Sequence, residues 1–399
     1  MTALLQKEHL AEVQVPTALA KGFVKVTELL EKGCQDGAFP GAVLLVSQHG
    51  QVLYNYSVGR KWLKSPEGIS NEMTRDTVFD LSNLTSVVVT TTLMMRFLEE
   101  GRFSLSDKVS RYVQAFGVNG KSAITIEHLL SHASALPAWH PYFEELARAN
   151  SADRIGILTS RGAREYILHS INRSVIKGEP GQRQALSDLN MFLLGFLIEN
   201  LSGMSLDKIA TKYIFQPLGM RNSSYIDLGM MKRRGILPLL DKIAPTEECQ
   251  WRRRVMCGEV QDENTWAIGG ISGQAGLFSN AWDLHLFASE MIRAYRGEST
   301  FLRRETVMRF FTGPSSFDND GEIHLGWESP NRENGMSNCG LSSHAVGQCG
   351  FTGCSLWMEP AQGVSITLMS NRVHPSRSSK QIRSFRPQLH SAILEALHS

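Results

Sequence analysis

Two strand-turn-strand patterns near opposite ends of the chain constrain its fold more than any other feature. In residues 41–59, β-branched and aromatic residues flank a turn at residues 48–51, and residues 354–371 repeat the pattern around a turn at residues 359–363. The segment between the hairpins has mainly helical patterns. We therefore expect an α/β (α+β) fold, in which a mixed, mostly antiparallel sheet from the N- and C-terminal parts is flanked by helices and accompanied by an inserted helical lobe.

This arrangement predicts how the chain divides. Residues 1–75 and 290–399 should form the lobe that contains the sheet, residues 76–289 should form the helical lobe, and both should belong to one domain. A cleft between the lobes is the expected place for a ligand. We also predict a helix over residues 85–100 and a last helix over residues 387–397.

Composition and charge exclude several classes of partner. The chain has 399 residues, of which 42% are hydrophobic and 20% are charged, as in ordinary globular proteins. Lys plus Arg number 41 and Asp plus Glu number 39, so the net charge of +2 predicts no nucleic-acid partner and no membrane partner. We interpret residues 251–254 and a later basic series as solvated surface, with contact to phosphate or lipid as the alternative. The later series is Arg372, Arg377, Lys380, Arg383 and Arg386.

The predicted location is the cytoplasm. Residues 1–22 carry charges every few positions and lack the continuous apolar run of a secretion signal. The longest apolar runs, such as residues 191–198, are far shorter than the ~18 residues that a membrane-spanning helix needs.

The cysteines and histidines predict no metal and no cofactor. Six cysteines are spread over the chain without a CxxC pair, which favours free thiols over a disulfide framework or a structural zinc site. His128 and His132 have the i, i+4 spacing of a metal-binding pair, but no metalloprotease glutamate and no third ligand accompanies them. We therefore interpret this pair as structural.

Several long segments, taken in order, resemble the framework of one enzyme family. They are FDLSNLTSVVVTTTLMMRFLEEGRFSLSDKVSRYV, ITIEHLLSHASALPAW, GEPGQRQALSDLNMFLLGFLIENLSGMSL, IFQPLGMRNSSY, GGISGQAGLFSNAWDL and GFTGCSLWMEP. On these segments the chain resembles the serine β-lactamase and penicillin-binding-protein-like hydrolases, in particular the class C branch that also contains esterases and DD-peptidases. The resemblance covers nearly the whole chain and implies the fold expected above.

The resemblance implies three catalytic motifs. In the first, Ser-x-x-Lys, the spacing places the serine and the lysine on one helical face, so the amine can take the proton of the seryl nucleophile. In the second, Tyr-x-Asn or Tyr-Ser-Asp, the phenol carries protons to the leaving group. The third, Lys-Thr-Gly or His-x-Gly, lies on the edge strand of the sheet. The backbone amide just beyond it forms an oxyanion hole with the amide of the nucleophile.

Each implied catalytic position holds a different residue in this chain. Asn83 stands where the resemblance places the nucleophile, and Ser86 stands where it places the lysine. Leu186 replaces the tyrosine, and Gln348 replaces the third-motif histidine or lysine. A carboxamide is not acylated as a serine is, an isobutyl group carries no proton, and a glutamine does not titrate. The catalytic motifs are therefore degenerate.

Glutamines also occur at two positions where related proteins often have histidine. They are Gln261 and Gln274, in the segments GEVQDEN and GQAG. A glutamine at either position keeps polarity and loses acid-base chemistry.

Removing a nucleophile and its base from a working site costs about a millionfold in turnover, on the order of 8 kcal/mol of barrier. The sequence therefore predicts a catalytically impaired or inactive family member, a pseudo-hydrolase. Its cleft would be kept for a small peptide, ester or cell-wall fragment, or its surface for a protein partner. The candidate cleft residues are Asn83, Ser86, Ser187, Asp188, Gln274, Gln348, Cys349 and Phe351.

Two other hypotheses stay open. One is a serine- or cysteine-dependent hydrolase, of the esterase, peptidase or β-lactamase type, with a non-standard active site. Its nucleophile would be Cys349, because a thiol is partly ionised near neutral pH, or Ser86, or a water held by Gln348 and Asp188. The other hypothesis is a structural subunit with a collapsed cleft.

Overall fold

The computed structural model describes residues 17–152, 157–313, 323–330, 336 and 339–398. Residues 1–16, which include most of the N-terminal segment used to predict the location, lie outside the described residues.

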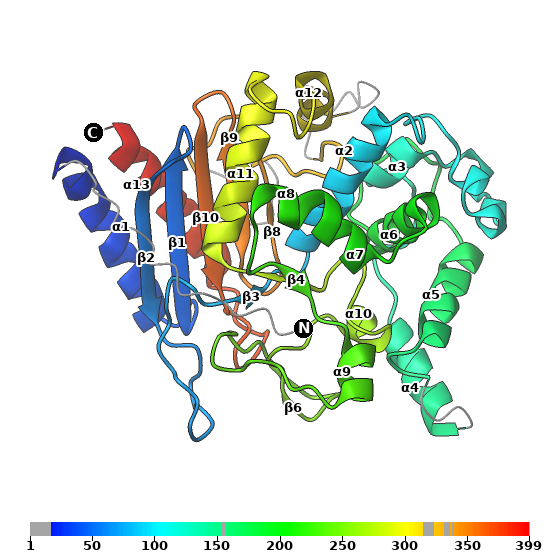
Figure 1. Cartoon of the computed structure of the whole chain (residues 1–399), viewed down its shortest axis with the longest axis horizontal. Helices are drawn as coiled ribbons and strands as arrows, with labels where there is room; N and C mark the ends of the chain where they lie inside the picture. The colour runs from blue at the N-terminus through cyan, green and yellow to red at the C-terminus, as the bar shows by residue number, and fades with distance from the viewer. Residues whose placement is uncertain (1–16, 153–156, 314–322, 331–335, 337–338, 399) are drawn as a thin grey trace.

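A five-stranded sheet is the centre of the fold. Its strand order is β2-β1-β10-β9-β8, and every neighbouring pair is antiparallel. The strands are β1 (Gly41–Gln48), β2 (Gln51–Gly59), β8 (Val346–Cys349), β9 (Ser355–Glu359) and β10 (Val364–Ser370). The N-terminal hairpin β1–β2 lies beside the C-terminal strand β10, so both ends of the chain build one sheet (Figure 1). The two predicted hairpins and the expected α/β fold are confirmed.

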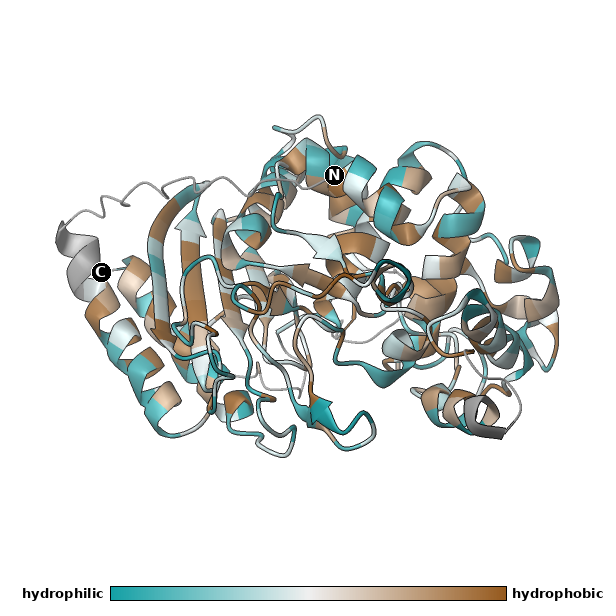
Figure 2. Cartoon of the chain, turned by 60° about the horizontal axis from the view of Figure 1, so that its bottom comes forward, coloured by the Kyte–Doolittle hydropathy of each residue, from teal (hydrophilic) through white to brown (hydrophobic). Residues whose placement is uncertain are grey.

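Helices cover both faces of this sheet. Helices α1 (Thr17–Gln35) and α13 (Ile382–His398) pack on one face, and α11 (Ala281–Arg296) packs on the other (Figure 1). Successive residues of a strand point to opposite faces, so Leu44 joins the core under α1 and α13 while Val43 joins the core shared with α11. The strands and the helices beside them carry many hydrophobic residues, brown in Figure 2.

The segment between the hairpins is mainly helical. Its α-helices before α11 are α2 (Thr92–Glu99), α3 (Ile126–Leu130), α4 (Tyr142–Ala152), α5 (Arg161–Arg173), α6 (Asp188–Ser202), α7 (Leu206–Ala210), α8 (Gln216–Leu218), α9 (Leu228–Arg234) and α10 (Glu263–Ala267), and α12 (Arg304–Thr312) follows α11. Helix α6 is buried along most of its length and ends at Gly203, whose left-handed conformation (φ 66°) suits glycine.

No single helix among the described residues has both the length and the apolar composition to cross a membrane. One bent pair, Asp188–Ser202 with Leu206–Leu218, meets the criteria jointly, with 76° between its two parts.

The helix predicted over residues 85–100 begins in a different conformation. A π-helical segment, η1 (Ser86–Thr91), precedes α2. The β-branched run from Val87 to Thr92 is crowded in a regular α-helix, and the Thr92 hydroxyl donates a hydrogen bond to the Val87 carbonyl at 2.9 Å. Short π-helical turns often mark functional sites, and this one starts at a candidate site residue.

The last helix is longer than the sequence predicts. Helix α13 begins at Ile382 instead of residue 387, because Ile382 and Phe385 pack into the core beneath the sheet. This extension brings the basic residues of the helix N-terminus toward the site described below. The boundary expected at residue 290 falls inside α11, which packs on the sheet.

Candidate functional site

A small three-stranded sheet lies next to the candidate site, and its first strand leads directly into the site residues. Its order is β3-β7-β4, with β3 (Phe79–Asp80), β4 (Ser224–Tyr225) and β7 (Leu277–Ser279); the further strands β5 (Glu248–Cys249) and β6 (Arg254–Val255) form a separate pair. The turn after β3 carries Ser82 in the left-handed region (φ 49°), a conformation that is uncommon for a residue with a side chain. A turn of this kind needs contacts that hold it.

The buried carboxylate of Asp80 supplies those contacts. Its Oδ1 accepts a hydrogen bond from the backbone N–H of Ser82 at 2.9 Å, and its Oδ2 accepts one from the backbone N–H of Gln261 at 2.6 Å. The Thr352 hydroxyl donates to the Asp80 carbonyl at 2.7 Å. Burial raises the pKa of Asp80 to about 6, although both amide hydrogen bonds favour its charged form. Three distant segments therefore converge next to Asn83.

Ser86 lies between two of the implied catalytic positions. Its Oγ is 2.7 Å from the Asn83 carbonyl oxygen and 3.0 Å from Gln348 Oε1, and it donates its single proton to one of these oxygens at a time. Ser86 and Gln348 are both buried, with 2% and 5% of their surfaces exposed. The positions that the resemblance assigns to the lysine and to the third motif are therefore in direct contact.

A cleft of about 240 Å³ opens beside this contact, and four of the candidate cleft residues line it, Asn83, Gln348, Cys349 and Phe351, together with Leu186 at the implied tyrosine position. The sequence segments that carry them are far apart along the chain, so their convergence follows from the fold. Ser86 contacts Gln348 but is not itself among the lining residues. Among the residues that the structure describes, no histidine or tyrosine lines this cleft.

Ser187 and Asp188 do not line the cleft. The Ser187 hydroxyl donates to the Pro137 carbonyl at 2.6 Å, and its amide donates to His132 Nδ1 at 3.1 Å. Asp188 is the first residue of α6, and burial, followed by the neighbouring charge of Asp262, raises its pKa to about 7. Of the three residues in the second motif, only Leu186 faces the cleft.

The two glutamines at histidine-like positions are buried. The backbone N–H of Gln274 donates to the Ser272 hydroxyl at 3.3 Å, and the side-chain Nε2 of Gln261 donates to Glu247 Oε1 at 2.9 Å. Neither glutamine lines the cleft. Gln274 was a predicted cleft residue, so the structure places it behind the site.

Among the described residues, no general base is hydrogen-bonded to either alternative nucleophile, Cys349 or Ser86. Burial raises the pKa of the Cys349 thiol above its ordinary value, so less thiolate is present near neutral pH than the sequence argument assumed. The hydrogen bonds of Ser86 go to a backbone carbonyl and to a carboxamide. In the described chain, His285 does contact the hydroxyls of Ser47 and Ser289, at 3.2 and 3.3 Å, but none of the three lines the cleft.

Two backbone donors remain beside the cleft. The N–H groups of Asn83 and Phe351 occupy the positions that the resemblance gives to the oxyanion hole. Neither N–H group donates a hydrogen bond to another described residue. Two N–H donors of this kind can bind an acceptor oxygen.

The interpretation of the basic series as solvated surface is wrong for Arg386, which is buried, and for Arg372, which is half-buried, whereas Arg377, Lys380 and Arg383 are exposed. Arg372, Lys380, Arg383 and Arg386 line the cleft, and Arg386 is only 3% exposed. The sequence signal for these cleft residues is the clustering of Lys380, Arg383 and Arg386, of which only Arg383 and Arg386 lie on helix α13.

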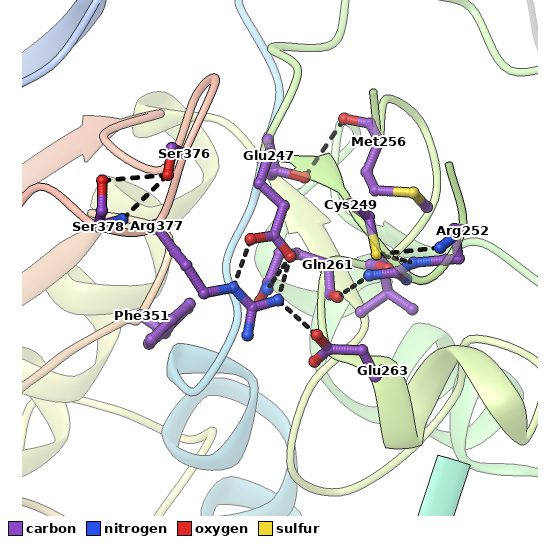
Figure 3. Close-up of polar contacts among 12 residues, drawn as sticks. Glu247, Cys249, Arg252, Met256, Gln261, Glu263, Phe351, Ser376, Arg377 and Ser378 are labelled. Carbon is purple, nitrogen blue, oxygen red and sulfur yellow. Dashed lines mark hydrogen bonds and ion pairs between the residues drawn. The ribbon is translucent and has the colours of Figure 1, made fainter. Parts of the chain in front are cut away.

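Arg377, the other member of the series, belongs to a neighbouring cluster (Figure 3). Its guanidinium forms ion pairs with Glu247 and Glu263 and lies 5.5 Å from the centre of the Phe351 ring. Among the described residues, Glu247, Cys249 and Glu263 are the one group whose potential metal ligands lie within 4.8 Å of one another. Arg377 already pairs with both carboxylates.

The Cys249 thiol of this group also has a hydrogen-bond partner. Arg252 Nε donates to Cys249 Sγ at 3.0 Å (Figure 3). The histidine pair of α3 has structural partners as well: His128 completes the cap of the helix at Thr125, and His132 accepts from the Ser187 amide. Nothing in these contacts directs a set of ligands toward a metal ion.

Comparisons with known proteins agree with this framework. The family model "Beta-lactamase" matches residues 26–387. A Bacillus subtilis (strain 168) N-acetylmuramyl-L-alanine amidase is 28% identical over 88% of this chain and 81% of its own length. A putative D-alanyl-D-alanine carboxypeptidase of Escherichia coli (strain K12) is 27% identical over 85% and 80%. The solved structure of EstCE1, a hydrolase with promiscuous acyltransferase activity, superposes with a TM-score of 0.69 at 22% identity, covering 96% of this chain and 99% of that one.

Proposed function

Because this chain belongs to the Beta-lactamase family, we propose that it is a member that no longer performs acyl transfer and uses the cleft to bind a small ligand. The observation that carries the proposal is the contact between Ser86 and Gln348, a hydroxyl and a carboxamide at the positions implied for the general base and the third motif. Neither group takes a proton near neutral pH.

The remaining parts of the site support binding without turnover. Asn83 at the nucleophile position forms no acyl ester, and Leu186 at the tyrosine position transfers no proton to a leaving group. The cleft next to them holds about 240 Å³, so there is space for a ligand group of modest size. Loss of chemistry together with an open cleft favours a binding role over that of a structural subunit.

Two relatives are named for amidase and D-alanyl-D-alanine carboxypeptidase reactions. Peptides that end in D-Ala-D-Ala and muropeptide fragments are therefore the first ligands to test in thermal-shift assays. A rise in melting temperature with such a peptide supports a cleft kept for cell-wall fragments. If none of these ligands stabilises the protein, cell-wall fragments are excluded as its ligands. Binding of a protein partner then becomes the stronger alternative.

The loss of chemistry is tested by turnover of a chromogenic ester and a chromogenic cephalosporin, with an active family member as the positive control. We expect rates about a millionfold below those of the active enzyme, indistinguishable from the buffer blank. Turnover that falls at least tenfold in Ser86→Ala or in Cys349→Ala would overturn the proposal and favour a hydrolase with a non-standard site.

A further inference from the structure

Positive charge dominates one wall of the cleft. Four cationic side chains line it, those of Arg372, Lys380, Arg383 and Arg386, and Glu328 is the one carboxylate among the lining residues. Arg372 follows β10, Lys380 lies in the turn before α13, and the other two lie in the first turns of that helix. The charges are therefore gathered by the end of β10 and the beginning of α13.

The two more buried guanidinium groups are held by neutral partners. Arg372 donates to the Phe351 carbonyl at 2.9 and 2.6 Å and to the Ser379 carbonyl at 2.8 Å. Arg386 donates to the Gly353 carbonyl at 2.7 Å, and its Nε is buried without a hydrogen-bond partner. Carbonyl oxygens fix the orientation of these groups but do not cancel their charge.

The two exposed cations have no structural role of this kind. The side chains of Lys380 and Arg383 form no hydrogen bond or ion pair with any other described residue. Arg383 lies close enough to Arg372 to affect its charge: burial first, and then the charges of Arg386, Arg383 and Arg377, lower the pKa of Arg372 to about 10. Like charges next to a cleft raise the free energy of the empty site, and an anion would lower it.

Arg377 shows how the chain neutralises a cation when the charge is not kept for a ligand. Its guanidinium pairs with the carboxylates of Glu247 and Glu263 (Figure 3). Arg377 is not among the residues that line the cleft. Among the described residues, Glu328 is the one carboxylate that lines the cleft beside its four cations. The excess positive charge is thus specific to the cleft.

We propose that the cleft binds a small molecule through a phosphate group, held by Arg383, Lys380, Arg372 and Arg386. This inference rests on the proposed function, because it takes the cleft to be a binding site. One carboxylate would bring a single negative charge, whereas a phosphate monoester or a diphosphate brings about two or more together with several acceptor oxygens. Guanidinium groups match the geometry of such oxygens with paired N–H donors.

Neutral donors at the same cleft suit the remainder of such a ligand. Asn83 Oδ1 accepts from the Ser82 hydroxyl at 3.0 Å, which leaves its Nδ2 without a partner among the described residues. The unpaired N–H of Phe351 lies at the same cleft. These groups offer hydrogen bonds to acceptor oxygens near the cationic wall.

Titration calorimetry with inorganic pyrophosphate tests the inference on the full chain. We expect saturable binding at low ionic strength and an affinity about tenfold weaker in the double variant Lys380→Gln/Arg383→Gln. The matched control is Lys32→Gln/Lys232→Gln, which removes two exposed helix lysines outside the cleft lining. The control should bind pyrophosphate as the parent protein does. Citrate, a polyanion without phosphate, should bind more weakly than pyrophosphate.

Three results would overturn the inference: no binding of pyrophosphate to the parent protein, equal loss of affinity in the cleft and control variants, or equal affinity for citrate. Melting temperatures no lower than that of the parent protein verify that both double variants fold. The readout is independent of the proposed loss of chemistry. If pyrophosphate fails to bind and no ester turnover is seen, the phosphate assignment alone is wrong; turnover would overturn the loss of chemistry whatever pyrophosphate does.

Discussion

The Ser86 hydroxyl lies 3.0 Å from Gln348 Oε1, although the two residues are 262 positions apart in the chain. Ser86 begins the π-helical segment η1, and Gln348 lies on the edge strand β8. The contact joins the helical part of the chain to the sheet at the point where the family resemblance places acid-base chemistry. Two neutral groups meet there, and neither of them titrates near neutral pH.

Replacing Ser86 should therefore affect stability more than any activity. Ser86→Ala removes the hydroxyl next to the buried Gln348 carboxamide, and we expect a loss of about 1–3 kcal/mol in the free energy of unfolding. The measurement is urea denaturation of Ser86→Ala, Gln348→Leu and the double variant. The double variant should lose less than the sum of the single losses, because no unpaired carboxamide remains. Simple additivity would contradict a coupling between the two residues.

Asp188 should make stability depend on pH. Its folded-state pKa of about 7 lies above the value of ~3.9 expected in the unfolded chain, so the folded state retains the proton longer. The stabilising contribution is therefore complete below about pH 4 and is lost as the pH rises toward 7. In denaturation experiments between these pH values, the free energy of unfolding should decline less steeply with rising pH for Asp188→Asn than for the parent protein. Asp76→Asn, at an exposed aspartate, is the control; an equal change in both variants would exclude Asp188 as the cause.

The cationic wall should make the empty protein sensitive to salt. Arg383→Gln removes one charge that repels Arg372, so the melting temperature at low ionic strength should stay the same or rise. Salt should abolish the difference, because the Debye length falls to about 3 Å at 1 M. Arg161→Gln is the control, because Arg161 forms an ion pair with Glu165 at 2.8 Å. Its removal should lower the melting temperature. A fall in melting temperature for Arg383→Gln would contradict the repulsion.

Restoring the four implied groups should restore some chemistry. The variant Asn83→Ser/Ser86→Lys/Leu186→Tyr/Gln348→His places a nucleophile, an amine, a phenol and an imidazole around a cleft that Asn83, Leu186 and Gln348 already line. We expect ester turnover above the buffer blank, with an acyl adduct mapped to the peptide that contains position 83. The control keeps Asn83 and carries the other three changes. Turnover that is equal in both variants would contradict the assigned position of the nucleophile.

Local patterns predicted the framework of the fold well. The turn at residues 48–51 and the turn at 359–363 were visible as glycine-containing breaks between β-branched runs, and both hairpins form there. The order of the framework segments predicted part of the cleft lining, although Ser86, Ser187, Asp188 and Gln274 do not line it. Asn83, Leu186 and Gln348 line one cavity, as the resemblance implies.

The parts that the sequence did not predict depend on tertiary packing. Helix α13 begins at Ile382 because Ile382 and Phe385 pack into the core beneath the sheet. No local sequence pattern indicates this packing. That extension carries Arg383 and Arg386 to the cleft. The burial that raises the pKa of Cys349 likewise depends on segments brought together only in the folded chain.

The most direct test of the account is intact-mass analysis after incubation with a fluorescent penicillin. The account predicts an unchanged protein mass and no fluorescent band, because position 83 offers a carboxamide and the hydroxyl of Ser86 contacts a backbone carbonyl and a carboxamide. An active family member treated in parallel should be labelled. A stoichiometric adduct on this chain that disappears in Ser86→Ala or in Cys349→Ala would contradict the central claim that acyl transfer has been lost.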